Sequence, residues 1–191
     1  MNKQPQITNQ TKANLQEAFW SLYTQKPIEK ISIREITDLA GYNRGTFYLY
    51  YRDVYDIFDA IKDDLIDKLT FVIQDTMQHN ETFDLSQQME FLVTLFQTHS
   101  KYAKVLLGDH GDPQFSSRIK EIIWPILNRY FVPSAGHSEY EMKLLAEFYL
   151  SGTLAVVSRW LQDPQMPLEE MIHFMVTETV SRAPSKKAGP L

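Results

Sequence analysis

The sequence predicts an all-α protein, and three observations lead to that prediction. Apolar residues recur every three or four positions over most of the chain, the spacing that places them on one face of a helix. Glycine is scarce, with seven residues in 191, and most of it falls between these periodic segments. Strand and helix patterns do not alternate, and no internal repeat is visible. With 43% apolar and 23% charged residues, the chain is neither disordered nor fibrous.

Four helices are expected in the first half of the chain, and their caps are visible in the sequence. Ser32 is expected to begin the second helix through a capping box with Glu35, and Gly41 is expected to end it. Asn43 and Asp53 are suited to cap the third and fourth helices. A Lys-Pro dipeptide at positions 26–27 ends the first helix. The four helices are expected at residues 15–26, 32–40, 43–51 and 53–77.

Five more helices are expected in the second half, which brings the total to about nine. Pro125 falls inside one of them and should kink it, because proline leaves the carbonyl of Glu121 without its partner. These helices are expected at residues 85–96, 102–107, 115–130, 139–161 and 168–182. We divide the chain into an N-terminal head (residues 1–52), a helical body (residues 53–182) and a flexible tail (residues 183–191).

Charge is distributed unevenly along the chain. Residues 1–52 carry seven Lys/Arg and four Asp/Glu, a net charge of +3, whereas the other 139 residues carry 12 and 20, a net charge of −8. A basic N-terminal segment on an acidic body fits a chain that presents one end to a polyanion such as DNA. Ordinary scatter explains the same numbers equally well.

Several classes of function lack the residues that they need. The chain has no cysteine, which excludes disulfides, thiolate metal sites and cysteine nucleophiles and fits a cytoplasmic location. The first residues contain no apolar signal-peptide core, and polar residues interrupt the apolar stretch at 144–161, so we expect no membrane segment. The five histidines are dispersed, and no catalytic motif occurs. We therefore expect no catalytic residues, no metal site and no cofactor.

The segment SIREITDLAGYNRGTFYLYY, Ser32 to Tyr51, carries the strongest functional signal. Two short helices joined by a glycine turn form a helix-turn-helix, whose second helix fits a major groove. The guanidinium of Arg44 can donate two hydrogen bonds to a base edge, and Gly45 allows the backbone to approach DNA closely. Phe47 and Tyr51 can pack inward. The alternative is a helical hairpin whose tyrosines fill a core. The residues expected to contact DNA are Ser32, Arg34, Tyr42, Asn43, Arg44, Gly45, Thr46, Tyr48, Leu49, Tyr50 and Arg52.

This segment resembles the tetracycline-repressor (TetR) family of one-component transcriptional regulators, and the match runs from Thr8 to Leu69. The resemblance implies a cytoplasmic homodimer that binds a palindromic operator in double-stranded DNA and is released by a small-molecule effector. Many members carry a phosphate-binding lysine after the recognition helix, where this chain has Arg52 followed by Asp53. The residues that match the family pattern are Arg34, Glu35, Gly41, Arg44, Gly45, Thr46, Phe47, Tyr48 and Tyr51.

Two further sites are expected in the body. The helix at 139–161 is apolar on nearly all sides and needs two burial surfaces, so we expect a dimer interface on the last two helices; a monomeric bundle is the alternative. The expected interface residues are Phe148, Gly152, Val156, Trp160, Met171 and Met175.

Aromatic side chains of the body suit a pocket for a mostly apolar small molecule, although a filled core is the alternative. The expected pocket residues are Phe96, Tyr102, Phe115, Trp124 and Tyr149.

Together these features predict a ligand-responsive DNA-binding regulator that acts as a repressor and is not an enzyme. Two alternatives remain. The first is an activator or co-regulator that is controlled by a protein partner. The second is a helical protein-interaction module that does not bind DNA.

Overall fold

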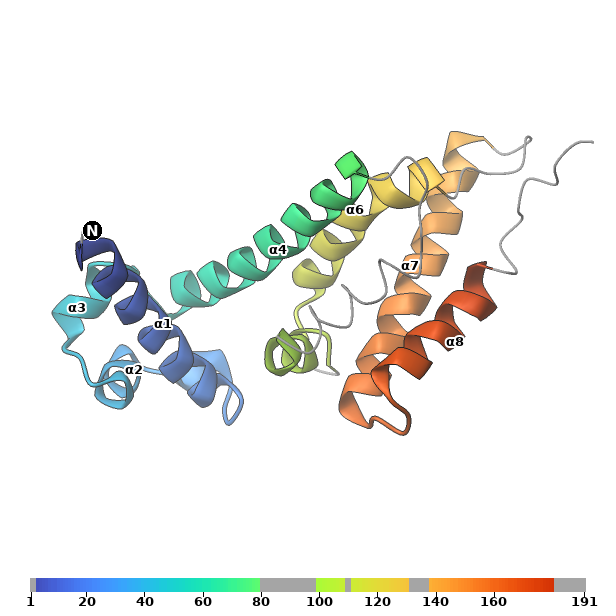
Figure 1. Cartoon of the computed structure of the whole chain (residues 1–191). Coiled ribbons are helices and arrows are strands. Elements are labelled where there is room, and N and C mark those ends of the chain that lie inside the picture. The colour runs from blue at the N-terminus through green and yellow to red at the C-terminus, as the bar shows by residue number, and fades with distance from the viewer. Residues whose placement is uncertain (1–2, 80–98, 109–110, 131–137, 181–191) are drawn as a thin grey trace, which may run out of the picture. The chain divides into compact units, whose positions relative to one another are not determined.

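A computed structural model of the protein describes residues 3–79, 99–108, 111–130 and 138–180, and all regular structure in these ranges is helical. The prediction of an all-α fold is confirmed. Eight of the nine expected helices lie in the described ranges, and the one expected at 85–96 lies outside them, as does the tail at 183–191. Residues 99–106 form one helix. The other elements (Figure 1) are α1 (Lys3–Tyr23), the 3-10 turn η1 (Ile28–Lys30), α2 (Ile33–Ala40), α3 (Arg44–Tyr48), α4 (Val54–His79), α6 (Pro113–Tyr130), α7 (Glu139–Gln162) and α8 (Leu168–Val180).

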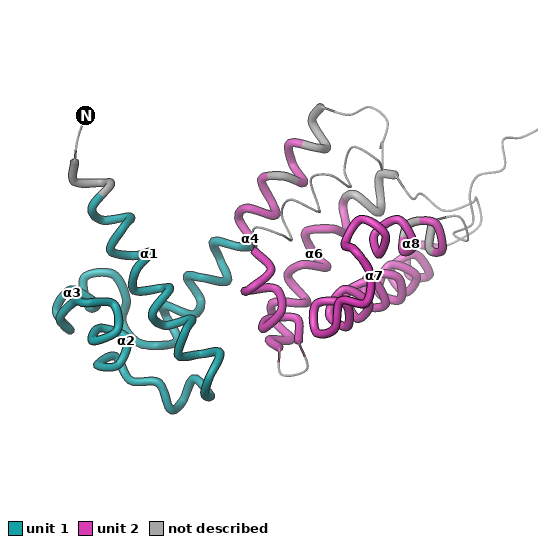
Figure 2. Tube along the Cα trace, turned by 60° about the horizontal axis from the view of Figure 1, so that its bottom comes forward, with its two compact units in different colours: residues 1–65 teal, residues 66–191 magenta. Residues whose placement is uncertain are grey.

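The chain divides into two compact units, residues 1–65 and residues 66–191 (Figure 2). The boundary proposed from the sequence, after residue 52, precedes α4, whereas the compact units divide inside α4. The first turns of α4 belong to unit 1 because they pack against α1. The ring of Phe58 lies 5.9 Å from that of Phe19 and 4.7 Å from that of Tyr23, measured between centroids.

Unit 1 is built around apolar side chains that each of its α-helices contributes. Burying these side chains is the main free-energy gain that holds such short helices together. The fully buried residues of unit 1 are Leu15, Phe19, Ile36, Thr37, Phe47 and Ile57. The first helix begins at Lys3, well before the apolar pattern that predicted it, and it ends before Pro27 as expected.

The predicted caps of unit 1 are present. The hydroxyl of Ser32 accepts the backbone N–H of Glu35, and the carboxylate of Glu35 accepts the backbone N–H of Ser32. Gly41 ends α2 with φ +75°, the left-handed conformation that favours glycine. Asn43 caps α3 through the N–H of Thr46. The carboxylate of Asp53 likewise accepts two backbone N–H groups of α4.

Unit 2 places α6 against α7 and α7 against α8. Its core contains Leu106, Phe115, Ile119, Leu150, Val157, Leu161, Leu168 and Ile172. Pro125 lies inside α6, as predicted. A second capping box begins α7, where Ser138 and Glu141 exchange side-chain and backbone bonds. The same Ser-x-x-Glu pattern therefore begins both α2 and α7. Within the described ranges, no helix is long and apolar enough to cross a bilayer.

Candidate nucleic-acid interface and effector cleft

The short helix α3 and the turn that follows it, residues 44–51, separate their aromatic residues between the core and the solvent. Phe47 and Tyr51 are buried, as the sequence predicts. Tyr48 and Leu49 are 59% and 76% exposed. Burial raises the pKa of the Tyr51 phenol to about 12, so this hydroxyl stays protonated. The helix therefore has one face anchored in unit 1 and another face open for contact.

The N-terminal end of α3 combines a closed cap with an exposed cation. The side-chain oxygen of Asn43 accepts the N–H of Thr46 at 2.9 Å and contacts the Thr46 hydroxyl at 3.3 Å. A Cβ added at Gly45 would lie 3.1 Å from that same oxygen, so glycine leaves the cap uncrowded. Arg44 is exposed and forms no ion pair within the described part of the chain. Its guanidinium is therefore available to an anion.

Two tyrosines beside α3 are braced by α1. The side-chain amide of Asn14 donates to the hydroxyl of Tyr42 at 3.0 Å. The ammonium of Lys12 lies 5.7 Å from the ring centroid of Tyr50, a cation–π contact. Both tyrosines are half-buried, and these contacts with α1 hold their side chains in place.

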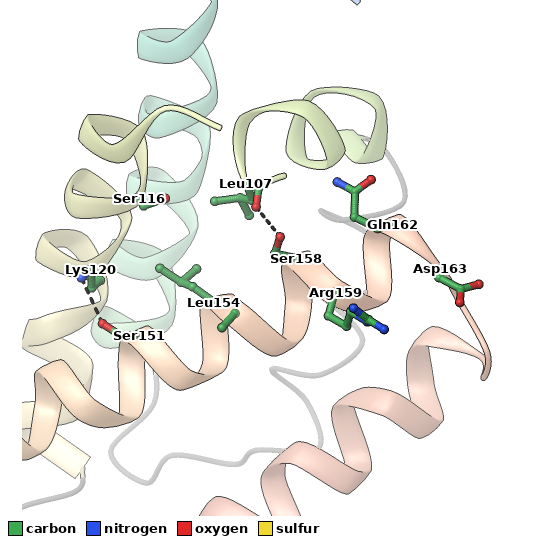
Figure 3. Close-up of a pocket in the computed structure, with 10 residues that line it drawn as sticks. Leu107, Ser116, Lys120, Ser151, Leu154, Ser158, Arg159, Gln162 and Asp163 are labelled. Carbon is green, nitrogen blue, oxygen red and sulfur yellow. Dashed lines mark hydrogen bonds between the residues drawn. The ribbon is translucent and has the colours of Figure 1, made fainter. Parts of the chain in front are cut away.

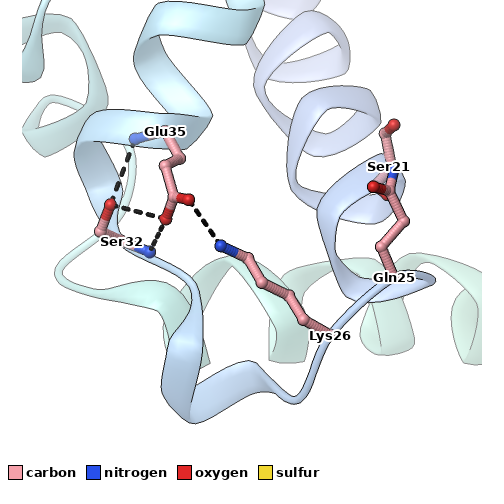
Figure 4. A network of polar contacts seen from close by, with 5 residues as sticks. All are labelled: Ser21, Gln25, Lys26, Ser32 and Glu35. Atoms are coloured by element: carbon pink, nitrogen blue, oxygen red, sulfur yellow. Dashed lines mark hydrogen bonds and ion pairs between the residues drawn. The ribbon is translucent and has the colours of Figure 1, made fainter.

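Ser32 has a local role besides the contact with DNA that the sequence suggests. Its hydroxyl donates to Oε2 of Glu35 at 2.8 Å, within the capping box. The ammonium of Lys26 lies 2.5 Å from Oε1 of the same carboxylate (Figure 4). The ion pair with Lys26, followed by the bonds from Ser32, lowers the pKa of Glu35 to about 2. This network joins the loop after α1 to the beginning of α2.

The other two arginines expected at DNA are paired with carboxylates. Nε of Arg34 lies 3.4 Å from Oδ2 of Asp38, and both side chains are exposed. Nη2 of Arg52 lies 3.0 Å from Oδ1 of Asp56, and the backbone N–H of Arg52 donates to Oδ2. These bonds lower the pKa of Asp56 and raise that of Arg52. Arg44 is thus the least neutralised of the three arginines.

The aromatic residues expected to line an effector pocket differ in burial where the structure describes them. Phe96 lies outside those residues, and Phe115 is buried in the core. Tyr102, Trp124 and Tyr149 are half-buried and do not line the cleft along α6 and α7 that is described next.

Unit 2 instead contains a cleft of about 700 Å³ along α6 and α7, beside the end of the helix at 99–106 (Figure 3). Its lining is mixed, with three serines, an amide, three charged residues and a few apolar side chains. The lining residues are Leu107, Ser116, Lys120, Ser151, Leu154, Ala155, Ser158, Arg159, Gln162 and Asp163.

The residues expected at a dimer interface differ in exposure and fall into three groups. Phe148 is 72% exposed, Gly152 and Val156 are exposed, and an added Cβ at Gly152 would meet nothing within 4 Å. Met171, in contrast, is buried within its own chain and is already covered. The remaining two, Trp160 and Met175, are half-buried, and the indole of Trp160 donates to the carbonyl of Met166 at 2.8 Å.

The local sequence pattern does not predict the residues that support the two candidate sites through contacts with other parts of the chain. Lys12, Asn14 and Lys26 support the helix-turn-helix from outside it, and nothing in their local pattern predicts these partners. Ser158 and Gln162 of the cleft also bond to residues more than 50 positions away. Such pairs depend on which helices become neighbours after folding.

Two comparisons of sequence relate the chain to known transcriptional regulators. Residues 84–178 match the TetR_C_8 family, a transcriptional regulator C-terminal region. The HTH-type transcriptional regulator YxbF of Bacillus subtilis is 22% identical over 175 residues, which cover 89% of this chain and 44% of YxbF. The chain thus spans less than half the length of this curated relative.

Two solved structures share the fold. A TetR transcriptional regulator from Streptococcus agalactiae matches with a TM-score of 0.66 and 22% identity, over 92% of this chain and 96% of the other. A TetR-family transcriptional regulator from Syntrophomonas wolfei matches with a TM-score of 0.71 and 17% identity, over 95% and 99% of the two chains.

Proposed function

Because the chain belongs to the TetR family of transcriptional regulators, we propose that it is a repressor that binds palindromic operator DNA as a homodimer. A small molecule that binds in unit 2 releases it from the DNA. The observation that carries this proposal is the geometry of residues 44–51, which comprise α3 and the turn after it. Phe47 and Tyr51 are buried, whereas Arg44, Tyr48 and Leu49 are exposed.

The exposed residues of α3 have complementary roles at a major groove. Arg44 is suited to a forked contact with a guanine or a phosphate, because no carboxylate among the described residues neutralises it. Leu49 is suited to apolar contact with a thymine methyl group, and the hydroxyl of Tyr48 to a phosphate. Arg34 and Arg52 reach DNA only by sharing or breaking their ion pairs, so we assign them weaker contacts.

An exposed row of residues on α7 supports the homodimer. The apolar stripe consists of Tyr140, Leu144, Phe148, Gly152 and Val156, spaced four residues apart. Its large side chains are exposed in the single chain, and Gly152 leaves open space between them. A row with this spacing is the ridge that packs into the groove of a second helix. Two copies of the stripe would bury each other across a two-fold axis.

Selection of bound fragments from a random double-stranded DNA pool tests the proposed function. The expected result is a palindrome whose half-sites are centred about one helical turn apart, roughly 34–36 Å. Affinity for that site should fall steeply as salt rises, because phosphate contacts release counterions. Failure to enrich any sequence would favour the protein-interaction module instead.

A reporter gene placed behind the selected operator separates repressor from activator. Repression predicts that expression rises when the regulator is deleted. An expression level that falls on deletion would make the protein an activator, the alternative in which a protein partner supplies control.

A further inference from the structure

We propose that the cleft along α6 and α7 is the effector site and that it takes a small, uncharged molecule rich in hydroxyl groups. This inference rests on the proposed function for its regulatory meaning, but the binding itself does not depend on DNA. It replaces the mostly apolar ligand that the aromatic residues suggested, because none of those aromatics lines the cleft.

The charges of the cleft are largely neutralised or directed elsewhere. The ammonium of Lys120 lies 2.5 Å from Oε1 of Glu147 and 3.1 Å from the hydroxyl of Ser151. Lys120, and then Ser151, hold the pKa of Glu147 below its usual value, so the pair stays ionised and matched. Arg159 points to the side of α7 away from Leu107, and Asp163 adds a charge of opposite sign (Figure 3). Lys120, the charged residue that α6 contributes to the cleft, therefore offers an anionic ligand no unpaired charge.

The neutral polar groups of the cleft can both donate and accept. Ser158 donates to the carbonyl of Leu107, and the amide of Gln162 donates to the carbonyl of Lys104 at 3.0 Å. Each of these carbonyls and hydroxyls retains capacity for a further bond. A ligand hydroxyl matches such a mixed set, because it donates one hydrogen bond and accepts two. An apolar ligand would desolvate the same groups without replacing their bonds, at a cost in free energy.

The apolar part of the lining suits the carbon skeleton of such a ligand. Leu107, Leu154 and Ala155 lie among the polar groups, with Leu154 between Ser151 and Ser158 along α7 (Figure 3). Hydroxylated carbon chains carry both C–H groups and hydroxyls, so they can contact apolar and polar side chains at once. A volume of about 700 Å³ falls within the usual range for small-molecule sites.

The cleft also lies beside the contact between α7 and the end of the helix at 99–106. The bonds from Ser158 and Gln162 fasten the end of the helix at 99–106 to α7. The fit there is tight, because a Cβ added at Gly108 would lie 2.5 Å from the Gln162 amide nitrogen and 2.7 Å from the Lys104 carbonyl oxygen. A ligand that exchanges hydrogen bonds with these groups shifts how the two helices are held, which gives binding a structural consequence.

Titration calorimetry on the full chain tests the proposal with three probe sets of similar size. The first set contains neutral polyols and sugars (glycerol, erythritol, xylitol, ribose and glucose), the second contains carboxylates and amines, and the third contains linear alcohols with one hydroxyl. We expect saturable binding in the first set only. Saturable binding confined to the second or third set, or binding by none of the first set, would overturn the proposal.

Adjacent serines on α6 supply a matched pair of variants. Ser116 lines the cleft, whereas Ser117 is exposed and does not. Ser116→Ala should weaken the binding polyol at least tenfold, and Ser117→Ala should leave its affinity unchanged. Gln162→Met should weaken binding similarly while circular dichroism shows the fold retained. Equal affinity in all three variants would place the ligand elsewhere and defeat the assignment.

Operator binding, measured without any probe, separates this inference from the proposed function. A protein that binds its operator but no polyol retains the proposed function and loses the ligand class. A protein that binds a polyol through Ser116 but no DNA retains the ligand site and loses the proposed function.

Discussion

Glu35 shows how one side chain in unit 1 can serve two neighbours. Its Oε2 closes the capping box of α2 with Ser32, while its Oε1 pairs with Lys26 of the preceding loop. Both partners favour the ionised carboxylate, which explains a pKa of about 2 against an ordinary value of 4.5. The carboxylate is partly exposed, so the network positions the chain more than it contributes free energy.

The depressed pKa of Glu35 makes the stability of unit 1 depend on pH in a defined window. Because the folded pKa lies below the unfolded one, its contribution is present above pH 4.5 and is lost as pH falls toward 2. Glu35→Gln keeps the capping box but removes the charge, so its stability should fall less steeply across that window. Urea unfolding at several pH values measures the difference, with exposed Glu29→Gln as the control. Identical slopes for Glu35→Gln and the parent would contradict this role.

Arg44 is the residue on which we expect operator affinity to depend most. Arg44→Ala should weaken operator binding by about 1–3 kcal/mol, the contribution of a guanidinium that donates two hydrogen bonds to a guanine. Lys30→Ala on η1 removes the same charge outside the recognition helix and should have a smaller effect. Fluorescence anisotropy at fixed salt compares the two variants. Equal losses would reduce the role of Arg44 to general charge attraction.

At the scale of the element, α3 is too short to be stable by itself. A helix of five residues forms too few internal hydrogen bonds to offset the cost of nucleation. It persists because Asn43 caps it and Phe47 is fully buried beneath it. The element that reads DNA is therefore stabilised from outside, by its cap and by the core of unit 1.

Two substitutions at Asn43 separate the stability of α3 from its contact with DNA. Asn43→Ala removes the cap and should lower the free energy of unfolding by about 0.5–2 kcal/mol. Asn43→Asp keeps a capping oxygen but places a negative charge beside the operator. We expect it to fold normally and to bind DNA more weakly. Thermal unfolding and operator titration distinguish the two effects, and unimpaired DNA binding by Asn43→Asp would move the interface away from this cap.

At the scale of the whole molecule, the proposed mechanism requires both a symmetric pair of heads and a signal from the body. The helix α4 begins in unit 1 and continues into unit 2, so it is the one described element that both units share. We expect ligand binding in unit 2 to act through this helix. A coupling of about 1–3 kcal/mol would lower operator affinity roughly 5–150-fold.

Gly152 provides a test of the dimer that leaves the single chain intact. The space beside it is open, so Gly152→Trp should not disturb the fold of the protomer. It should prevent close approach of a second α7, shift sedimentation toward monomer and abolish operator binding. Glu169→Trp, exposed on α8 outside the apolar stripe, is the matched control. A Gly152→Trp variant that stays dimeric would place the interface on another surface.

The sequence by itself determined the features that depend on neighbours along the chain. Helical spacing of apolar residues predicted the all-α class, and local cap patterns located the ends of α2, α3 and α4. Phe47 and Tyr51 were predicted to face inward for the same reason. Caps and helix faces involve residues three or four positions apart, so their partners are already fixed before the chain folds.

Only the tertiary structure decided which arginine side chains remain free to bind an anion and where unit 2 forms a cleft. Arg34 and Arg52 are ion-paired while Arg44 is open, although all three look alike as sequence. The cleft along α6 and α7 is lined by serines from both helices and by none of the aromatic residues from which we expected a pocket. A cleft exists where side chains of separate helices fail to fill the space between them. That outcome depends on helix packing, which the periodicity of a single helix does not encode.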